Sequence, residues 1–219
     1  MIQLENVTFT YNGSEEKGNL KNINLSIRQG EVILLCGESG CGKTTLTRLI
    51  NGLIPWYYEG ELNGIVRVDG KEIREQPLHI LSRKIGSVFQ NPRSQFFNVD
   101  TTSEIAFSCE NQGLPEDEIR ERIHQTVSLF QIENLIDRNI FHLSGGEKQK
   151  IACASVSAGE PEIFVLDEPS SNLDVAAIED LKHIISCWKS AGKTVIIAEH
   201  RLYYLMELAD RIIYMQNGE

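Results

Sequence analysis

Short apolar runs recur along the chain and predict the strands of a sheet. Five of them have the length of a strand and stand at residues 31–36, 85–89, 163–166, 194–198 and 212–215. Stretches with helical spacing separate the later runs, as consecutive β-α-β units of a parallel sheet require. No internal repeat or long linker interrupts this order. We therefore expect one continuous fold with a parallel α/β core.

Alternating polar and apolar positions indicate a second kind of strand. Residues 1–27 and 64–69 alternate in this way, and the dipeptides Asn12-Gly13 and Asp69-Gly70 lie in or beside them. Such dipeptides favour tight turns between antiparallel strands. A small antiparallel sheet is therefore expected beside the parallel one.

Two longer stretches carry apolar residues every three or four positions, which is the spacing of one helix face. The first follows Pro115 and an acidic turn, and the second begins at Asp174 and ends at Gly192, as helix ends commonly do. A third stretch, residues 44–53, is also compatible with a helix. The apolar positions of the first two are Ile119, Ile123, Val127 and Phe130, and Ile178, Leu181, Ile185 and Trp188.

Composition narrows the class of protein. The 219 residues are 41% hydrophobic and 24% charged, which suits one large globular domain. No run approaches the roughly 18 apolar residues of a membrane span, and the first residues lack the pattern of a secretion signal. The net charge of −10, without a basic cluster, argues against binding to nucleic acid or to a lipid surface. We expect a cytoplasmic chain that reaches a membrane only through partner proteins.

A glycine-rich segment follows the first apolar run and has the spacing of a phosphate-binding loop. It reads LCGESGCGKTT from Leu35 to Thr45. In such loops backbone N–H groups surround phosphate oxygens, the lysine reaches the β and γ phosphates, and the first hydroxyl residue binds Mg²⁺. A glycine-rich turn with an accidental lysine is the alternative. The residues expected at the nucleotide are Gly37, Glu38, Ser39, Gly40, Cys41, Gly42, Lys43, Thr44 and Thr45.

The five cysteines form no C-x-x-C pair and are an odd number, so reduced thiols are expected. Cys41 lies inside the loop, beside Lys43, and both features favour a thiolate. We expect Cys41 to react with thiol reagents and to be protected by nucleotide, whereas Cys36 ends an apolar run and is expected to be inert. The alternative is that Cys41 fills a small-residue position with its sulfur turned inward.

Two adjacent carboxylates end the apolar run 163–166, in the segment IFVLDEP. They are expected at the carboxyl end of a buried strand, where open α/β sheets bind ligands. Phosphoryl transfer to water needs a metal ion and a group that orients or deprotonates the water. Asp167 is the candidate for the Mg²⁺ site and Glu168 for the general base. The alternatives are that Asp167 caps the following turn and that Glu168 is a solvent-exposed acid in a loop.

The segment LSGGEKQ at residues 143–149 resembles the signature of the ATP-binding-cassette (ABC) ATPases, and further matches follow the order of that family. Tyr11 matches the aromatic residue that stacks on adenine, Gln90 the glutamine loop, and His200 the switch histidine. Residues 171–174 (SNLD) resemble the D-loop. The resemblance implies that His200 and Gln90 act in catalysis, with Gln90 also at the metal, and that the signature contacts ATP through Ser144, Gly145, Gly146 and Glu147.

The same resemblance implies an architecture and a partner. The chain is expected to be a single ABC ATPase domain over residues 1–219, with a RecA-like P-loop NTPase core and a small antiparallel β subdomain. A helical subdomain is expected at about residues 96–154. Two such domains are expected to form a head-to-tail dimer, in which the signature of one covers the ATP bound by the other, with ATP and Mg²⁺ as cofactors.

Two further segments resemble one branch of the family. VFQNPRSQFF at residues 88–97 and TSEIAF at residues 102–107 resemble the ATPases of energy-coupling factor (ECF) transporters and of cobalt and nickel importers. That resemblance implies an integral-membrane coupling protein, a separate subunit that captures a vitamin or metal ion, and a place at the cytoplasmic face of the membrane. Arg93-Ser94 stand where an acidic pair is common in that branch. EHRLYYL at residues 199–205 resembles the first half of fused two-cassette members.

Other classes of protein fit the sequence less well. An ABC ATPase that acts on DNA would carry a long coiled coil before the signature, and one that acts on ribosomes normally has a basic surface for RNA. A small-molecule kinase has no use for the LSGGE segment. A non-transport ABC ATPase that acts on nucleic acid or ribosomes is the alternative to the importer.

Overall fold

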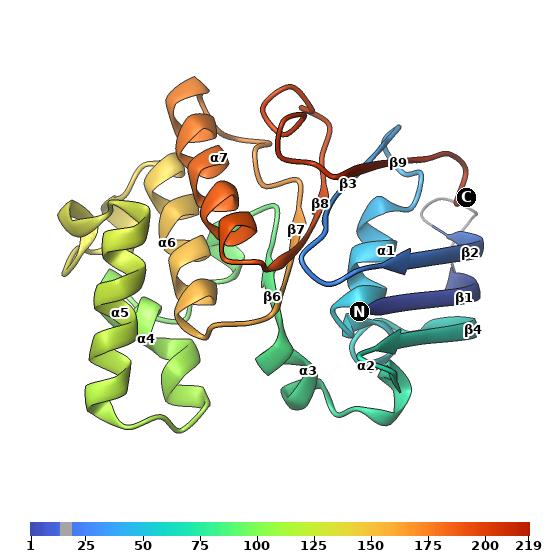
Figure 1. The fold of residues 1–219 in the computed structure, drawn as a ribbon, viewed down its shortest axis with the longest axis horizontal. Helices are drawn as coiled ribbons and strands as arrows, with labels where there is room; N and C mark the ends of the chain where they lie inside the picture. Colours follow the sequence, from blue (N-terminus) through green and yellow to red (C-terminus); the bar gives the residue numbers. More distant parts are fainter. Residues whose placement is uncertain (14–18) are drawn as a thin grey trace.

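Two sheets form the framework of the computed structural model, which describes residues 1–13 and 19–219. One is antiparallel with strand order β2-β1-β4-β5, and the other is parallel with strand order β6-β7-β8-β3-β9. Figure 1 shows them beside each other, with the antiparallel strands on the right and the helices α4 to α7 on the left. The predicted combination of a parallel α/β core and a smaller antiparallel sheet is confirmed.

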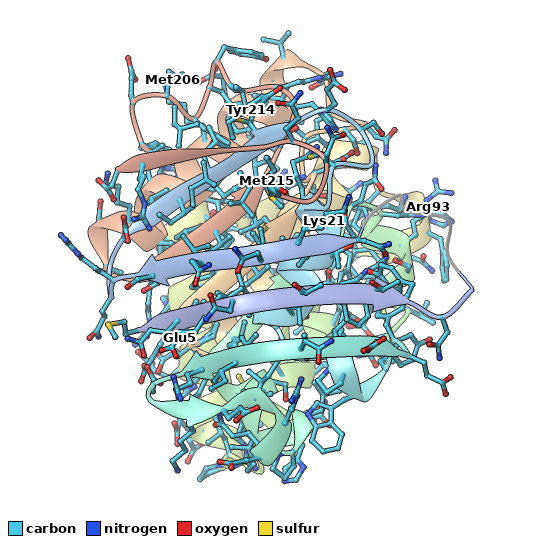
Figure 2. The ribbon with its side chains drawn as sticks, turned by 90° about the vertical axis from the view of Figure 1, so that its right-hand side faces the viewer. Glu5, Lys21, Arg93, Met206, Tyr214 and Met215 are labelled. Carbon is cyan, nitrogen blue, oxygen red and sulfur yellow. The ribbon has the colours of Figure 1, made fainter. Side chains whose placement is uncertain are left out.

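The antiparallel sheet is built from the alternating segments. It comprises β1 (Ile2–Tyr11), β2 (Leu20–Ile27), β4 (Gly60–Val68) and the short β5 (Lys71–Glu72). Asp69 and Gly70 join β4 to β5 with φ of 50° and 76°, as the predicted turn requires. The outer face of this sheet carries polar side chains such as Glu5 and Lys21 (Figure 2).

The parallel sheet contains all five predicted apolar strands. They are β3 (Val32–Gly37), β6 (Ile85–Val88), β7 (Ile163–Asp167), β8 (Thr194–Ala198) and β9 (Arg211–Met215). β7 is apolar on both faces because a hydrophobic cluster lies on each side of it. Phe164 stacks on Trp188 of α7 with ring centroids 4.0 Å apart, whereas Val165 packs in the cluster that includes Leu46 of α1.

Seven α-helices lie in the described part of the chain. They are α1 (Lys43–Ile50), α2 (Leu53–Trp56), α3 (Leu78–Lys84), α4 (Thr101–Asn111), α5 (Glu116–Phe130), α6 (Gly145–Ala158) and α7 (Val175–Ser190). None of those described is long and apolar enough to cross a membrane. The helix expected over residues 44–53 stops earlier, because Gly52 adopts a φ of 79° that breaks the helical path.

The helices divide between the two faces of the parallel sheet. α1 lies between this sheet and the antiparallel one, and α6 and α7 cover the opposite face (Figure 1). α4 and α5 pack on α6. The helices α1 and α6, which follow the two glycine-rich motifs, therefore start on opposite sides of the sheet.

Asp100 gives a direct test of how α4 begins. Its carboxylate accepts the Ser103 N–H at 2.8 Å, which is a side-chain N-cap. We expect Asp100→Ala to lower the free energy of unfolding by about 1 kcal/mol, or the melting temperature by roughly 2–4 °C. Asp100→Asn, which keeps an acceptor, serves as the matched control in thermal and urea unfolding. Equal losses for both variants would contradict the cap.

The same cap has a defined pH dependence. The Ser103 hydrogen bonds hold the pKa of Asp100 below its usual range. The ionised Asp100 carboxylate therefore contributes to the free energy of unfolding above the unfolded-state pKa of about 3.9, and this contribution is lost as the pH falls through the folded-state pKa. The stability gap between wild type and Asp100→Ala should consequently narrow below about pH 4.

Candidate functional site

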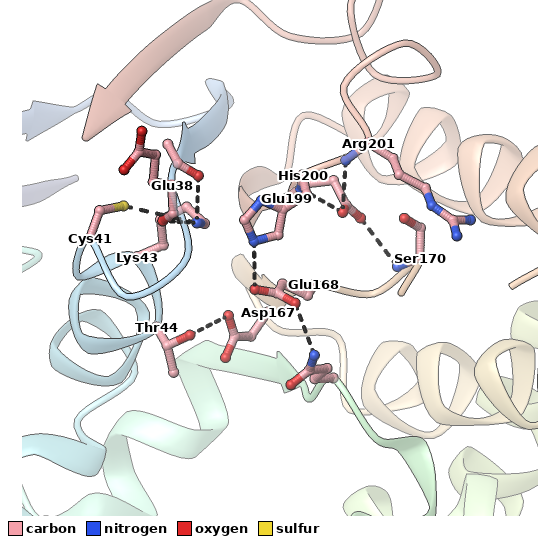
Figure 3. A network of polar contacts seen from close by, with 12 residues as sticks. Glu38, Cys41, Lys43, Thr44, Asp167, Glu168, Ser170, Glu199, His200 and Arg201 are labelled. Atoms are coloured by element: carbon pink, nitrogen blue, oxygen red, sulfur yellow. Dashed lines mark hydrogen bonds and ion pairs between the residues drawn. The ribbon is translucent and has the colours of Figure 1, made fainter. Parts of the chain in front are cut away.

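Four adjacent strands end at the same edge of the parallel sheet and bring the predicted chemistry together. Gln90 follows β6, Asp167 ends β7, His200 follows β8, and the glycine-rich loop follows β3. Figure 3 shows the resulting network, with the loop and the two carboxylates facing each other across a short space. Side chains from positions as distant in the sequence as Lys43 and His200 therefore share one site.

The loop between β3 and α1 has the backbone that its glycines were expected to provide. Gly37, Gly40 and Gly42 have φ of 145°, 80° and 108°, which residues with side chains rarely adopt. A Cβ at Gly37 would collide with Met215 O, whereas one at Gly40 would meet open space. The loop therefore presents its backbone at Gly40 without a side chain in the way, as close approach by a phosphate requires.

Lys43 lies inside the loop and points its charge into the site. Its side chain is 4% exposed, and Nζ donates to Gly37 O at 2.9 Å and to Glu38 O at 3.1 Å. A buried ammonium is favourable only with such partners or with an anion. The lysine is therefore held where a phosphate could replace or join the carbonyl oxygens.

Thr44 and Asp167 form a pair of hard oxygen donors. Thr44 Oγ1 donates to Asp167 Oδ1 at 3.0 Å. Burial raises the pKa of the Asp167 carboxyl, against the Thr44 hydrogen bond that lowers it. A carboxylate whose charge is destabilised by burial gains from a nearby cation, and hydroxyl and carboxylate oxygens are ligands that Mg²⁺ accepts. The pair thus fits the divalent metal expected from the sequence.

Glu168 is held from two sides. Gln90 Nε2 donates to its Oε2 at 2.9 Å, and His200 Nε2 lies 3.1 Å from its Oε1 (Figure 3). The backbone of Glu168 has a φ of 46°, and its N–H donates to Ala198 O at 2.8 Å. A positive φ in a residue with a side chain is uncommon and is found preferentially at functional sites. The structure thus brings the three candidate catalytic residues into contact.

Tyr11 lies at the end of β1 and contacts α1. Its hydroxyl is 3.2 Å from Thr45 Oγ1 and accepts Arg48 Nη1 at 3.0 Å. The ring meets Phe9 and Tyr58 edge-on, with centroids 4.8 and 6.3 Å away. The aromatic side chain is therefore fixed next to the helix that follows the loop, a contact that sequence spacing alone did not indicate.

The signature segment forms the start of α6. Ser144 Oγ accepts the Glu147 N–H at 3.2 Å, and Glu147 Oε2 accepts the Ser144 N–H at 2.7 Å, which is a capping box. These hydrogen bonds hold the pKa of Glu147 below its usual range. The carboxylate of Glu147 is thus used to build the helix end, so its place in nucleotide binding would be indirect.

The two signature glycines have different surroundings. A Cβ at Gly146 would come within 2.6 Å of Ala177 Cβ in α7, whereas one at Gly145 would meet only Asn172 O at 3.8 Å. Gly146 therefore allows α6 and α7 to pack closely. The S-x-x-E spacing could have revealed the capping box, but the helix contact at Gly146 is a tertiary feature without a local signal.

The expected reactivity of Cys41 toward thiol reagents does not agree with the place of its side chain in the structure. Its side chain is 6% exposed and belongs to the hydrophobic cluster around α1, with Sγ facing Gly37. The alternative of an inward sulfur describes it correctly. Cys36 is buried as expected, and burial raises the pKa of its thiol. Among the cysteines of the described residues, Cys187 alone is not buried.

Sequence reasoning gave no role to Glu199, which the structure places directly behind His200. Its side chain is 1% exposed, and its oxygens accept from donors in two separate segments. The available signal was a carboxylate immediately after the largely apolar run of β8, whose five residues are all buried, a position where a charged residue needs specific partners.

Comparison with known proteins gives a consistent result. The model of the ABC transporter family matches residues 20–171. A protein from Treponema denticola that is named as an ABC transporter ATP-binding protein is 56% identical to this chain over 219 residues. The match covers all of this chain and 45% of that protein. A second one from the same organism is 46% identical, and the chain covers 44% of it. The chain spans less than half the length of these two relatives.

Solved structures resemble the fold closely. CbiO1 from Clostridium perfringens, described as part of the ABC transporter complex CbiONQ, has a TM-score of 0.86 and 31% identity, over 99% of this chain and 85% of that one. The bacterial ABC transporter cassette MJ0796, in a dimeric post-hydrolysis state with ADP and Pi, has a TM-score of 0.85 and 28% identity, over 100% and 96% of the chains.

The exposure of the thiols predicts their order of reaction. We expect a thiol reagent to label Cys187 first, because Cys41 is shielded inside the loop. Peptide mapping after brief labelling measures this order, and Cys187→Ser, which should bind ATP normally, is the matched control. Faster labelling of Cys41 than of Cys187 would show that the loop opens readily.

Proposed function

The chain belongs to the ABC transporter family, and from this premise we propose that it binds ATP with Mg²⁺ and hydrolyses it to drive an importer of the ECF type. The membership makes it the ATPase domain of a transporter. The observation that carries the catalytic assignment is the contact of Glu168 with both Gln90 and His200, beside the Thr44–Asp167 pair.

The loop residues have the chemistry to bind the triphosphate. Backbone N–H groups of residues 37–45 and the dipole of α1 would favour the anion, and Lys43 would contribute a positive charge. Thr44 and Asp167 would hold Mg²⁺, with Gln90 close to the same space. The metal, when bound, neutralises charge that develops on the phosphate oxygens.

Glu168 has the position of a general base. Gln90 and His200 restrict the orientation of its carboxylate, so one oxygen can accept a proton from water that faces the loop. General-base assistance typically contributes about 10²–10⁴-fold to a rate. His200 and Gln90, which contact different oxygens of Glu168, would therefore act by keeping the carboxylate in a productive orientation.

A complete site would need a second cassette. In one chain α1 and α6 start on opposite faces of the parallel sheet, so the signature helix and the phosphate loop do not face one ligand (Figure 1). A head-to-tail pair would bring the N-terminus of α6 from one domain to the loop of the other. The dimeric form of the similar cassette MJ0796 supports this arrangement.

The second cassette could lie in the same polypeptide. In the two Treponema denticola relatives, the part that this chain does not cover is longer than the part it covers, since the covered shares are 45% and 44%. The segment EHRLYYL at residues 199–205 also resembles the first half of family members in which two cassettes are fused, which agrees with this arrangement. We infer that this chain is one half of such a protein.

A groove between α3, β6 and α4 has the properties of a docking site for the membrane coupling protein. Its cavity volume is about 580 Å³, and Leu78, Ile85 and Phe107 are among the residues that line it. Phe97, which is 75% exposed, stacks on Phe107 with centroids 4.7 Å apart. An exposed aromatic ring stacked on a half-buried one in a concave surface suits an apolar segment of a partner protein.

Hydrogen bonds connect the wall of this groove to the segment that carries Gln90. Gln95 Oε1 accepts the Phe89 N–H at 3.2 Å, and Gln90 is the next residue. The buried Glu104 carboxylate fixes the other side by accepting the N–H groups of Phe97 and Asn98 at 3.0 and 2.8 Å. A segment docked at Phe97 could thus change the position of Gln90. The substrate-capture subunit and its vitamin or metal ion would contact the coupling protein and not this domain.

Glu168→Gln tests the general base. We expect ATP binding to persist and turnover in the full-length, assembled transporter to fall by about 10²–10⁴-fold, because the amide keeps the shape but accepts no proton. The closed, ATP-bound pair of cassettes should accumulate and be detectable by size-exclusion chromatography. Wild-type hydrolysis by this variant would rule out Glu168 as the base.

Ser144→Arg tests the assignment of the signature to the partner's nucleotide. We expect normal binding of a fluorescent ATP analogue by the isolated domain, but loss of cassette closure and of ATP hydrolysis in the complex. Ser144→Ala is the control, because it removes the same N-cap at a cost of about 1 kcal/mol without adding bulk or charge. Loss of binding in the isolated Arg variant, with the Ala variant unaffected, would contradict the assignment.

A further inference from the structure

Glu199 is a buried carboxylate that joins two segments of the site. Its Oε1 accepts the N–H groups of His200 and Arg201 at 2.7 and 3.2 Å, and its Oε2 accepts the Ser170 N–H at 3.2 Å and the Tyr204 hydroxyl at 3.0 Å. The side chain is 1% exposed. Figure 3 shows it between the turn after β8 and the segment after Glu168.

The four donors explain how a charge is tolerated in this place. Three of them are backbone N–H groups, and hydrogen bonds to a charged acceptor are roughly twice as strong as neutral ones. Burial and the neighbouring carboxylate raise the pKa of the Tyr204 hydroxyl, so it stays protonated and remains a donor. An apolar residue at position 199 would leave these buried donors without an acceptor.

The donors belong to the two segments that meet at the candidate base, Glu168. One is the turn that carries His200, and the other is the chain that follows Glu168. His200 contacts Glu168 directly, at 3.1 Å. Ser170 stands two residues after Glu168 and leads into residues 171–174. Arg201 adds a second link, because its Nη1 donates to Leu173 O at 3.0 Å. The backbone at His200 and the backbone that follows Glu168 thus donate hydrogen bonds to the same carboxylate, that of Glu199.

We infer that Glu199 is a positioning residue for ATP hydrolysis, which holds His200 against Glu168 and links that contact to residues 170–174. This inference rests on the proposed function, because it acts through the role of His200 there. Glu199 touches neither nucleotide nor water in this assignment. Its effect is on the geometry of the Glu168–His200 contact.

Glu199→Gln is the informative variant. The amide keeps the size of the side chain but replaces one acceptor oxygen with an NH₂ donor, which must then face an N–H or hydroxyl donor. We expect kcat of the full-length protein to fall by about tenfold or more, as loss of a charge-assisted contact implies. KM for ATP should stay within about twofold, because the phosphate loop is unchanged.

Tyr204→Phe is the matched variant, because it removes one donor and leaves the carboxylate and the three backbone N–H groups in place. We expect a smaller fall in kcat, about two- to fivefold, in keeping with one hydrogen bond. Thermal unfolding of both variants shows whether the fold is retained.

The decisive measurement is a double-mutant cycle with His200→Ala, which measures whether two residues act through the same contact. If Glu199 acts through His200, Glu199→Gln should have almost no further effect on kcat in the His200→Ala background. A multiplied loss would mean that Glu199 acts independently, and it would overturn the positioning role alone. If Glu199→Gln does not fold, the same cycle with Tyr204→Phe makes the same distinction.

His200→Ala by itself separates this inference from the proposed function. A wild-type kcat for that variant would remove His200 from the proposed mechanism, and the positioning role of Glu199 would fall with it. An impaired His200→Ala together with a multiplied double-mutant loss leaves the proposed function intact and rejects only the role of Glu199.

Discussion

The parallel pairing of β7 between β6 and β8 is the constraint on which the whole site depends. Leu166 aligns with Val88 on one side and with Ile197 on the other, and Asp167 aligns with Ala198. Because both edges of β7 are paired, its end cannot shift along the strand without breaking hydrogen bonds on two sides. β3 continues the alignment, since the Glu199 N–H donates to Leu35 O at 3.0 Å. The four chain segments that carry the chemistry therefore leave the sheet at the same level.

The three carboxylates at this edge have different environments, which suit them to different tasks. Asp167 is half-buried with one hydroxyl donor, and desolvation raises the pKa of its carboxyl, so a cation would stabilise its charge. Glu168 is partly exposed and touches two side chains that restrict its orientation. Glu199 is buried and has four donors, so it needs no cation. Separation of carboxylate roles by surroundings is a general feature of catalytic sites.

Local patterns predicted the framework well because their causes are local. The bounds of β8 follow the apolar run, α7 starts at the cap of Asp174, and Asp69-Gly70 form the expected turn. The features that were missed depend on tertiary contacts. The sulfur of Cys41 turns inward because the loop folds over it, and Glu199 acquires its donors only when β7 and β8 are paired. Periodicity places a residue on an element, but it does not say which side chains another segment brings to it.

Under the proposed function, association and chemistry can be coupled through the chain segment that follows Glu168. Residues 171–174 and the start of α6 would face the second cassette. A Cβ added at Gly145 would lie 3.8 Å from Asn172 O, so these two segments are neighbours. Movement of this region would reach Ser170, which shares the Glu199 carboxylate with the turn that carries His200. The contact between His200 and Glu168 would then depend on where the partner holds residues 171–174. A cassette without its partner would keep the acid and the imidazole in contact but would lack the signature helix of a second domain opposite its phosphate loop, and slow hydrolysis by the isolated domain follows from that missing half.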